Sequence, residues 1–512
     1  MNTSRLLALV AIAGATATAV VATGSPATRP GANHTAVGLT AAATAFDLAR
    51  LRAAGGAEID HRLRLWSLPQ ASPGTIASLR RRGALAFSAR VRHYVVSDVA
   101  PPAPDPLLPA EWWRSVVGAD RAVPPGPGVP VTVVDSGVSV GHPEFVDRPD
   151  LTVLNPQEPA PVGGVHGTMV SSVVGAPSNG VGTVGIYPRA ALRSWDTALG
   201  DGSALDSVEI ARGVLAAARA GRGVINLSLG GGPDPVLALA IEEAVGRGSL
   251  VVAASGNEGA EGSPRSYPAV LPHVVTVAAT GRDGSVTSFS SRSPYVDLAA
   301  PGDGIVVASA LTGSWEEASG TSFSAPIVSG AAAWLWTMRP ELDAGQVAEI
   351  LRRSARDIGL PGRDTATGFG MLDLPAALAA PTPRRDPFEP NDRIANVIAG
   401  NERNLVRAPG LTAPGRTSTT LVARVDRYED PVDLYRVWIP ARRRLALTLR
   451  TTGENDLLLS SGRGPLSPRT RSQGGRAQLL YVNNGPARVA YVGVTATPAI
   501  AATTYALSTR IG

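Results

Sequence analysis

Three residues of the chain have the types that nucleophilic catalysis needs. Asp135 ends the apolar run that begins at Val131, His166 opens the segment His-Gly-Thr, and Ser322 lies in Gly-Thr-Ser. In chain order they are separated by 31 and 156 residues. A serine hydroxyl becomes a useful nucleophile when a histidine takes its proton and a carboxylate holds that histidine in the right tautomer. The order Asp, His, Ser is one of those in which this geometry occurs, so the pattern indicates acyl transfer.

Each motif on its own also has an ordinary structural explanation. An aspartate after a strand often lies in a turn, and a serine often caps a helix. Pro326 closes the segment Gly320-Thr-Ser-Phe-Ser-Ala-Pro. Because proline disrupts a helix interior, we expect Pro326 in the first turn of the helix there. Ser322 would then lie at the helix N-terminus, where free N–H groups and the helix dipole favour a developing anion.

The other five histidines are weaker candidates for the base. His34, His61 and His93 all precede a proline-rich segment near residue 100. His273 stands at the entrance to a predicted strand, in Leu-Pro-His-Val-Val. His142, in Gly-His-Pro-Glu, has two interpretations: a turn or surface residue, or a residue that lines a substrate groove.

Composition excludes several classes of chemistry. The 512 residues include no cysteine, and all 47 basic residues are arginine. Thiol nucleophiles, cysteine-ligated metals and disulfides are therefore excluded, as are a lysine Schiff base and a Ser–Lys dyad. Residues 1–108 and 381–512 carry net charges of +6 and +9, whereas residues 109–380 carry −10. Because the positive charge lies in the two flanks, we expect no nucleic-acid partner for the whole chain.

The chain divides by composition into five parts. Arg5 precedes an uncharged stretch from Leu6 to Val21 that small residues follow, which is typical of a cleaved export signal. Proline-rich segments near residue 100 and at Pro381–Pro387 read as linkers. The expected parts are a signal peptide at residues 1–27, an N-terminal region at 28–106, a main domain at 107–380, a linker at 381–387 and a C-terminal domain at 388–512.

The main domain alternates short apolar runs with helical patterns. The runs are Val129–Val134, Gly223–Leu229, Ser249–Ala254 and Val274–Ala279, and the helices include Ser203–Ala220, Pro235–Arg247 and Asp343–Ile358. Fully apolar strands alternating with helices favour an α/β fold with a parallel sheet covered on both faces. Asp343 with Gln346 three residues on is a capping-box pattern.

The C-terminal part has a different pattern. Short alternating runs are separated by turn residues, at Leu434–Ile439, Leu445–Leu449, Leu457–Leu459 and Ala490–Val494. Such spacing predicts an all-β sandwich for residues 388–512.

Taken together, the motifs resemble those of the subtilisin-like serine proteases, the peptidase S8 family. The matching segments are Val133-Val-Asp135-Ser-Gly, His166-Gly-Thr, Val224-Ile-Asn-Leu-Ser228-Leu-Gly-Gly231, Val252-Ala-Ala-Ser-Gly-Asn257-Glu-Gly259, Gly320-Thr-Ser322-x-x-x-Pro326 and Gly368-Phe-Gly-Met-Leu-Asp373. They occur in the family's order over about residues 107–378. The resemblance implies a subtilisin-like parallel sheet with helices on both faces, preceded by a small propeptide and followed by the β-sandwich.

The resemblance also implies the roles of the residues. Ser322 would attack the peptide carbonyl, His166 would carry the proton, and Asp135 would orient the histidine. The chain would thus be a secreted serine endopeptidase that works through an acyl-enzyme and is made as a self-processed precursor.

Two further segments have implied roles in the same family. The Asn257 amide would bind the oxyanion together with the Ser322 N–H. Ser228, Leu229 and Gly230 would pair with an extended protein or peptide substrate by strand addition, with the glycine permitting close backbone approach.

The sequence also departs from the family pattern. Phe323 stands where the family usually has methionine, and Ser324 and Ile327 replace the usual alanine and histidine. We expect no cofactor in the chemistry. Structural calcium is common in the family, and Asn179 in the loop Pro177–Gly182 is a candidate ligand. Calcium takes about 6–8 oxygens, however, and the sequence does not assign a metal site.

The flanks fit the same picture. Residues 28–106 stand where the family carries an inhibitory propeptide that assists folding, so the chain's own propeptide is an expected partner. The tail resembles the pre-peptidase C-terminal domain of secreted bacterial proteases at Asp386–Asp392, Asp433–Pro440 and Asn455–Leu459. Its net charge of +9 would suit anionic cell-wall polymers or would simply keep the protein soluble. We therefore expect an extracellular location, with contact to the cell surface as a second expectation.

Two alternatives remain open. The protease can be a narrow processing enzyme rather than a degradative one, because specificity depends on loops that the sequence does not place. The fold can also be retained as a surface-binding protein in which the β-domain is the working part.

Overall fold

The computed structural model describes residues 34–60, 64–69, 73–90, 105–155, 165–199, 204–386, 388–391, 408–426, 430–453, 455–460, 469–496 and 502–512. The chain forms two compact units, residues 1–100 and residues 101–512. The predicted signal peptide, residues 1–27, lies outside the described residues. Within the described ranges, no helix is both long enough and apolar enough to span a membrane.

The first unit is a small antiparallel sheet with two helices. Its elements are β1 His34–Leu39, α1 Ala45–Ala53, β2 Ala57–Asp60, β3 Leu65–Pro69, α2 Pro73–Arg81 and β4 Leu85–Arg90, and the strand order is β2-β3-β1-β4. Val37, Leu51, Trp66, Leu68 and Leu79 pack together as its core. A small unit of this kind agrees with the expected N-terminal domain.

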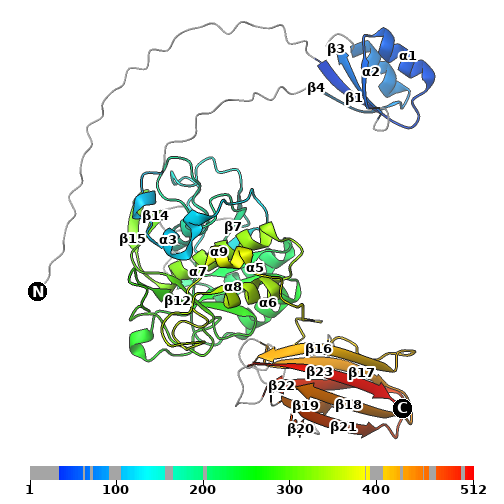
Figure 1. The fold of residues 1–512 in the computed structure, drawn as a ribbon. Coiled ribbons are helices and arrows are strands. Elements are labelled where there is room, and N and C mark those ends of the chain that lie inside the picture. The colour runs from blue at the N-terminus through cyan, green and yellow to red at the C-terminus, as the bar shows by residue number, and fades with distance from the viewer. Residues whose placement is uncertain are drawn as a thin grey trace, which may run out of the picture. The chain divides into compact units, whose positions relative to one another are not determined.

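The second unit contains a seven-stranded parallel sheet (Figure 1). Its strands are β5 Val131–Asp135, β6 Leu151–Val153, β7 Leu192–Asp196, β10 Val224–Leu227, β11 Leu250–Ala254, β12 Val274–Thr280 and β13 Leu298–Pro301, in the order β13-β12-β11-β10-β5-β7-β6. All neighbouring pairs run parallel. The predicted parallel sheet is therefore confirmed.

The remaining elements of this region are helices and short hairpins. The helices are α3 Trp113–Val117, α4 Val165–Gly175, α5 Ser207–Arg219, α6 Pro235–Gly246, α7 Thr321–Met338, α8 Ala344–Ser354 and α9 Leu374–Ala379. Three short 3₁₀ helices are η1 Leu108–Ala110, η2 Ala119–Arg121 and η3 Gly259–Glu261. The hairpins pair β8 Ala198–Leu199 with β9 Ala204–Leu205, and β14 Ile305–Ser309 with β15 Ser314–Ala318.

Helices cover both faces of the parallel sheet. Alternate residues of each strand point to opposite faces, so Val133 of β5 packs in one core and Val134 in the other. The first core also contains residues of α4, α7, α8 and α9, and the second contains residues of α5 and α6. This explains the fully apolar strand sequences, because such strands are buried on both sides. The predicted capping box of α8 is present, with the Gln346 N–H donating to the Asp343 carboxylate at 2.8 Å.

The C-terminal part is an antiparallel β-sandwich, drawn in orange and red in Figure 1. Its strands are β16 Ser418–Asp426, β17 Val432–Ile439, β18 Arg444–Thr451, β19 Asn455–Ser460, β20 Arg469–Arg471, β21 Arg476–Val482, β22 Arg488–Ala496 and β23 Ala502–Ile511. They form two sheets in the orders β16-β23-β18-β21 and β17-β22-β19-β20, which share one apolar core. The predicted all-β class is confirmed, whereas the pre-peptidase C-terminal identity and the domain boundaries stay predictions.

Candidate active site

The carboxyl end of the parallel sheet brings the predicted residues into one region. Asp135 is the last residue of β5, and Ser228 directly follows β10. Asn257 lies three residues beyond the end of β11, the next strand of the sheet. Parallel strands end at the same edge, and in open α/β sheets ligands bind outside that edge. Strand order therefore brings Asp135 to the same edge as two residues that lie 93 and 122 positions further along the chain.

Asp135 and His166 form a hydrogen-bonded pair. His166 is the second residue of α4, and its Nδ1 lies 2.9 Å and 3.0 Å from the two Asp135 carboxylate oxygens. The Ser136 N–H also donates to the Asp135 carboxylate, at 2.7 Å. Asp135 is fully buried, whereas 38% of the His166 side chain is exposed. The carboxylate thus orients the ring and leaves Nε2 to face the other way.

The charge of His166 is set by two opposing effects. Burial alone would lower the pKa of His166, because it disfavours the imidazolium. The Asp135 carboxylate outweighs this by its charge and its hydrogen bond, so the pKa of His166 is raised above its ordinary value. A histidine in this state accepts a proton readily and holds it as a stabilised cation.

Ser322 is the second residue of α7, the helix that packs near His166 through its third residue. The ring of the next residue, Phe323, lies 6.1 Å from the His166 ring, measured between centroids. In this structure the Ser322 hydroxyl donates to the Ser228 carbonyl at 3.2 Å. Catalytic hydrogen bonds often form only when substrate is bound, so this orientation describes the free protein.

One prediction about this helix is wrong. Pro326 does not lie in the first turn of α7 but is its sixth residue, inside the helix. Proline has no N–H to bond the carbonyl four residues earlier, which here is that of Ser322. The helix continues because that carbonyl has another donor, the Ser228 hydroxyl, at 2.8 Å.

The orientation of the Asn257 amide follows from its neighbours. The N–H and the hydroxyl of Thr321 both donate to Asn257 Oδ1, each at 2.9 Å. A backbone N–H can only donate, so the oxygen of the amide must face Thr321 and Nδ2 must face away. Asn257 Nδ2 is therefore available as a donor beside the N-terminus of α7.

Gly320 lies next to a space that adjoins two hydrogen-bond donors. A Cβ built on Gly320 would lie 3.4 Å from Asn257 Nδ2 and 3.7 Å from the Ser322 N atom. An atom in that space can thus be near both donors, which is the arrangement that binds an oxyanion. Any side chain at residue 320 would occupy part of this space.

The segment Ser228–Gly230 follows β10 and runs from a buried residue, Ser228, to the surface. Leu229 is half-buried, and Gly230 is exposed. The next residue, Gly231, exchanges backbone hydrogen bonds with Tyr267 at 3.0 Å and 2.9 Å. The pairing with Tyr267 fixes one side of the segment, so Leu229 and Gly230 present backbone groups that an extended peptide can pair with.

His142 is a buried structural residue. Its Nδ1 accepts the Glu144 N–H at 3.1 Å, so Nε2 carries the proton and donates to the Ser314 carbonyl at 2.8 Å. Burial lowers the pKa of His142, partly offset by the bond to Ser314. Both nitrogens are occupied and only 2% of the residue is exposed. His142 thus lies in a turn, as one interpretation predicted, but it is buried and neither lies at the surface nor lines a groove.

The loop after α4 contacts a buried carboxylate from an earlier part of the chain, which sequence analysis missed. Asp105, which is 2% exposed, accepts the N–H groups of Asn179 and Gly180 at 3.0 Å and 3.1 Å and the Ser178 hydroxyl at 2.9 Å. Asn179 Oδ1 accepts the N–H of Val181 in its own loop at 3.0 Å. Asp105 thus accepts three hydrogen bonds from the loop, and Asn179 stays a candidate calcium ligand.

Glu144 is a second buried carboxyl at this loop. Its Oε2 accepts the Thr183 N–H at 3.2 Å and the indole N–H of Trp315 in β15 at 2.6 Å. Its Oε1 is buried without a hydrogen-bond partner. Burial is the main reason that the pKa of Glu144 is raised to about 7. No sequence pattern marked this residue, because its partners come from segments about 40 and 170 positions away.

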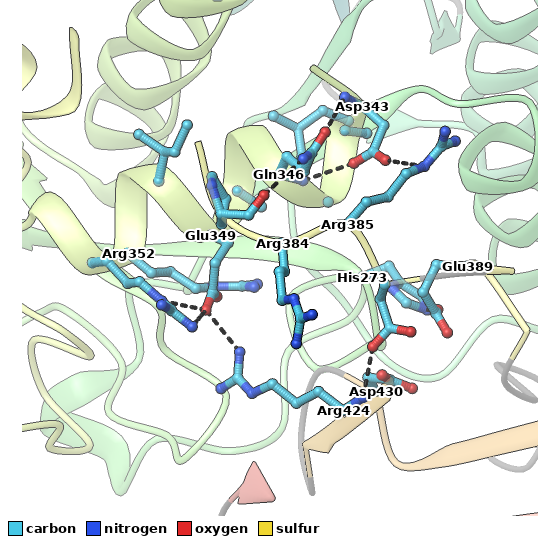
Figure 2. A pocket seen from close by; sticks show the side chains of 18 of the residues that line it. His273, Asp343, Gln346, Glu349, Arg352, Arg384, Arg385, Glu389, Arg424 and Asp430 are labelled. Carbon is cyan, nitrogen blue, oxygen red and sulfur yellow. Dashed lines mark hydrogen bonds and ion pairs between the residues drawn. The ribbon is translucent and has the colours of Figure 1, made fainter. Parts of the chain in front are cut away.

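A large cavity lies away from the residues described above (Figure 2). Its volume is about 1410 Å³, and none of the predicted catalytic residues lines it. Charged side chains line it, and Arg424 of β16 contacts Glu349 of α8 at 2.9 Å. Burial alone would raise the pKa of Glu349, but Arg424 and the neighbouring arginines outweigh it and hold this pKa below its usual value. Ion pairs between α8 and β16 thus form part of the lining.

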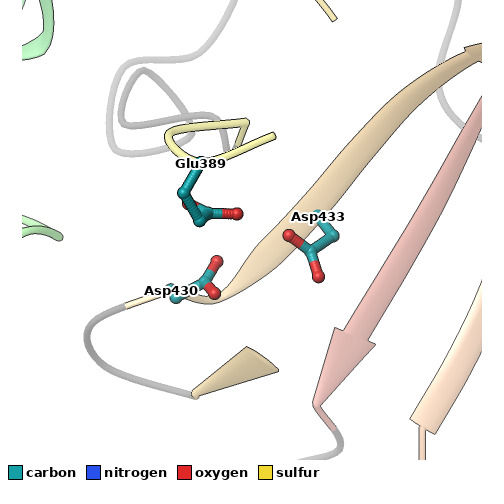
Figure 3. A group of neighbouring side chains, drawn as sticks. All are labelled: Glu389, Asp430 and Asp433. Atoms are coloured by element: carbon teal, nitrogen blue, oxygen red, sulfur yellow. The ribbon is translucent and has the colours of Figure 1, made fainter. Parts of the chain in front are cut away.

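Among the described residues, three acidic side chains near this cavity lie close enough together that they could hold a metal ion (Figure 3). Oxygens of Glu389, Asp430 and Asp433 all lie within 4.8 Å of one another. Carboxylate oxygens suit calcium, but three of them supply only part of the 6–8 ligands that calcium takes. The expectation of structural calcium stays a prediction.

Comparisons with known proteins agree with this geometry. Residues 126–370 match the profile of Peptidase S8, the subtilase family. Subtilisin BL from Lederbergia lenta is 35% identical over 254 residues, which cover 49% of this chain and 91% of that protein. Subtilisin E from Bacillus subtilis (strain 168) is 34% identical over 258 residues, which cover 49% of this chain and 66% of that protein.

Solved structures give weaker similarities. The psychrophilic subtilisin-like protease Apa1 from Pseudoalteromonas sp. AS-11 has a TM-score of 0.46 at 20% identity and covers 52% of this chain and 97% of its own. Sphericase has a TM-score of 0.43 at 25% identity and covers 51% of this chain and 96% of its own.

The match to nearly the whole length of a subtilisin, together with the parallel sheet and the residues at its carboxyl edge, identifies the family. The chain belongs to the subtilase family of serine endopeptidases.

Proposed function

We propose that this protein is a secreted endopeptidase that cleaves peptide bonds through an acyl-enzyme, with Asp135, His166 and Ser322 as the catalytic triad. The observation that carries the proposal is the pair of hydrogen bonds between buried Asp135 and His166 at 2.9 Å and 3.0 Å. These bonds fix the tautomer that leaves His166 Nε2 free to act as a base toward Ser322.

In the proposed reaction the Ser322 oxygen attacks the carbonyl carbon of the scissile peptide. His166 takes the hydroxyl proton as the C–O bond forms and then gives it to the leaving amine as the C–N bond breaks. The acyl-enzyme is next attacked by water, with His166 again taking and returning the proton. Asp135 stabilises the imidazolium in both steps without taking the proton.

The oxyanion of each step would be held by Asn257 Nδ2 and the Ser322 N–H. Support comes from the Thr321 bonds that turn Nδ2 outward and from the space at Gly320 that adjoins both donors. Both donors stand at the N-terminus of α7, where the helix dipole favours negative charge.

Protein or peptide substrates would bind as an added strand along Ser228, Leu229 and Gly230. Backbone pairing of this kind accepts many sequences, which is consistent with either a degradative or a processing role. A peptide-library cleavage profile separates the two, because a processing enzyme cuts few sequences.

We further propose that the enzyme is made as a precursor whose first unit is its own inhibitory propeptide. The catalytic unit already includes Asp105 and Leu107, which bond to the loop residues Asn179 and Gly182. A cut that leaves those contacts intact must fall before Asp105. Export, and contact of the basic C-terminal part with anionic cell-wall polymers, belong to the same proposal.

The test uses purified protein and a fluorophosphonate probe, which reacts with activated serines. We expect wild type to be labelled and Ser322→Ala to remain unlabelled and unprocessed. Processed wild type that does not label would contradict the triad and would favour the alternative of a surface-binding protein.

A further inference from the structure

The backbone around the proposed nucleophile has an unusual hydrogen-bond requirement. Pro326 lies within α7 and has no N–H, so the helix cannot supply the usual donor to the Ser322 carbonyl. A buried carbonyl without a donor is costly, and the proline ring also crowds that carbonyl. A donor from outside the helix can take the place of the missing N–H.

The donor is the Ser228 side chain, and the contact is reciprocal. The Ser228 hydroxyl donates to the Ser322 carbonyl at 2.8 Å, and the Ser322 hydroxyl donates to the Ser228 carbonyl at 3.2 Å. Ser228 is 3% exposed, so water does not compete freely for this carbonyl. Two hydrogen bonds thus join the end of β10 to the residue that carries the nucleophile.

Ser228 is held in turn by a buried chain of side chains. Asn226 Nδ2 donates to the Ser228 hydroxyl oxygen at 2.9 Å, and the Ser329 hydroxyl donates to Asn226 Oδ1 at 2.9 Å. Asn226 and Ser329 are both fully buried. Because Asn226 supplies a donor to Ser228, the single proton of the Ser228 hydroxyl is directed to Ser322. Ser329 lies seven residues after Ser322 in α7, so the chain returns to the same helix.

We infer that Ser228 is a positioning residue for catalysis, whose hydroxyl replaces the helical hydrogen bond that Pro326 removes and so fixes the first turn of α7. This inference rests on the proposed role of Ser322 as the nucleophile. The fixed turn holds both the Ser322 Oγ and the Ser322 N–H, that is, the attacking atom and one oxyanion donor. A displacement of about 1 Å at such a site costs about 10²-fold in rate.

The inference gives the Ser228 side chain and the Ser228 backbone different roles. Strand addition by substrate uses backbone groups, which alanine keeps, so Ser228→Ala should leave KM almost unchanged. Loss of the hydroxyl should instead lower kcat by about 10- to 100-fold, because it acts on the geometry of the attack. Rates are taken per active site, titrated with a fluorophosphonate.

The decisive variant is Ser228→Ala combined with Pro326→Ala. Alanine at residue 326 restores a backbone N–H four residues after Ser322, so the helix can bond the carbonyl by itself. We expect Ser228→Ala to lower kcat much less in the Pro326→Ala background than in the wild-type background. The two fold-reductions in kcat should differ by at least about tenfold. Non-additivity of this kind measures coupling between the two positions.

Ser324→Ala is the matched control. Its hydroxyl lies in the same turn of α7 but donates to the carbonyls of Ala300 and Pro301, at 3.0 Å and 3.1 Å. The effects of Ser324→Ala and Pro326→Ala on kcat should simply add, so Pro326→Ala should not restore any kcat that Ser324→Ala loses. If Ser228→Ala does not fold, Ser228→Thr and Ser228→Val are compared instead. Threonine and valine have similar shapes, and only threonine keeps the hydroxyl.

Two results would overturn the inference: a kcat of Ser228→Ala equal to that of wild type, or no recovery in the double variant. Failure of the proposed function has a different signature, since the wild type itself would then not react with the fluorophosphonate.

Discussion

Asp135 controls both the orientation and the charge of His166. Its carboxylate raises the pKa of His166 against the opposing effect of burial. The base must be neutral to accept the serine proton, so activity should appear as the pH rises through this raised pKa. The acid limb of kcat/KM should therefore lie above about pH 6.5, the ordinary value for histidine.

Asp135→Asn should change both the rate and the pH profile. Asparagine cannot stabilise the imidazolium, so burial should dominate, lower the pKa of His166 and move the acid limb to lower pH. We expect kcat to fall by about 10⁴-fold, the loss known for this substitution in a triad of another fold. The check is a pH–rate profile of both proteins. An unchanged acid limb in the variant would mean that another group titrates.

The sequence singles out the candidate catalytic residues one by one, and the structure brings two of them, Asp135 and His166, into contact. Asp135, His166 and Ser322 were identified from residue type and order, and Asn257 and Ser228 from the family motifs around them. The partner that completes each role was not identified. Thr321 turns the Asn257 amide, and Ser228 satisfies the Ser322 carbonyl, through contacts between residues 64 and 94 positions apart.

At the scale of elements, Glu144 connects the loop after α4 to the hairpin that precedes α7. Its carboxylate bonds Thr183 of the loop and Trp315 of β15. Burial raises its pKa from an ordinary value of 4.5 to about 7, so the ionised form is the one that the fold disfavours. The protein should therefore lose stability as the pH rises from about 4.5 to about 7 through this group.

Glu144→Gln should remove that loss, because glutamine keeps an acceptor oxygen and carries no charge. At pH 8 the variant should be more stable than the parent, by up to about 3 kcal/mol at 1.36 kcal/mol per pKa unit. Near pH 4.5 the two should be equal. The measurement is denaturant unfolding of both proteins in a Ser322→Ala background, which prevents self-digestion.

Calcium and a chelator are the controls for this comparison. A variant that is less stable than its parent at pH 8, only when calcium is present, would show that Glu144 is ionised and paired with a cation. That result would contradict the stabilisation expected for Glu144→Gln.

The apolar runs predicted β5, β10, β11 and β12 to within a few residues, whereas β6, β7 and β13 of the same sheet were not predicted. Strands that are buried on both faces are recognised in the sequence as continuous apolar runs. The capping box is recognised by the spacing of Asp343 and Gln346. Pro326 was misplaced because the sequence rule considers the helix alone. The compensating donor comes from the end of β10, and only packing brings it there.

At the scale of the whole molecule, charge separates the C-terminal part from the centre. Residues 381–512 carry a net charge of +9, against −10 for residues 109–380. Arg442, Arg443 and Arg444 are three consecutive exposed arginines beside the turn between β17 and β18. An exposed basic segment of this kind attracts polyanions, and salt weakens that attraction.

The Ser322→Ala protein should therefore sediment with anionic cell-wall preparations at low salt and dissociate at about 1 M salt, where the Debye length is about 3 Å. Arg442→Gln combined with Arg443→Gln should weaken this binding. The control, Arg121→Gln combined with Arg292→Gln, removes the same charge from exposed sites of the acidic centre. Equal weakening by both pairs would show that only net charge matters, against a surface on the C-terminal part.

The sequence by itself determined the chemistry and the class of fold, because both are written in local patterns. A nucleophile, a base and an acid are recognised by residue type and order, and a doubly covered sheet by its apolar strands. The tertiary structure alone decided how these groups are held. The direction of the Asn257 amide, the donor for the Ser322 carbonyl and the burial of Glu144 depend on contacts between residues more than 35 positions apart. Such contacts exist only after the strands have taken their order in the sheet and α4 and α7 have packed against it.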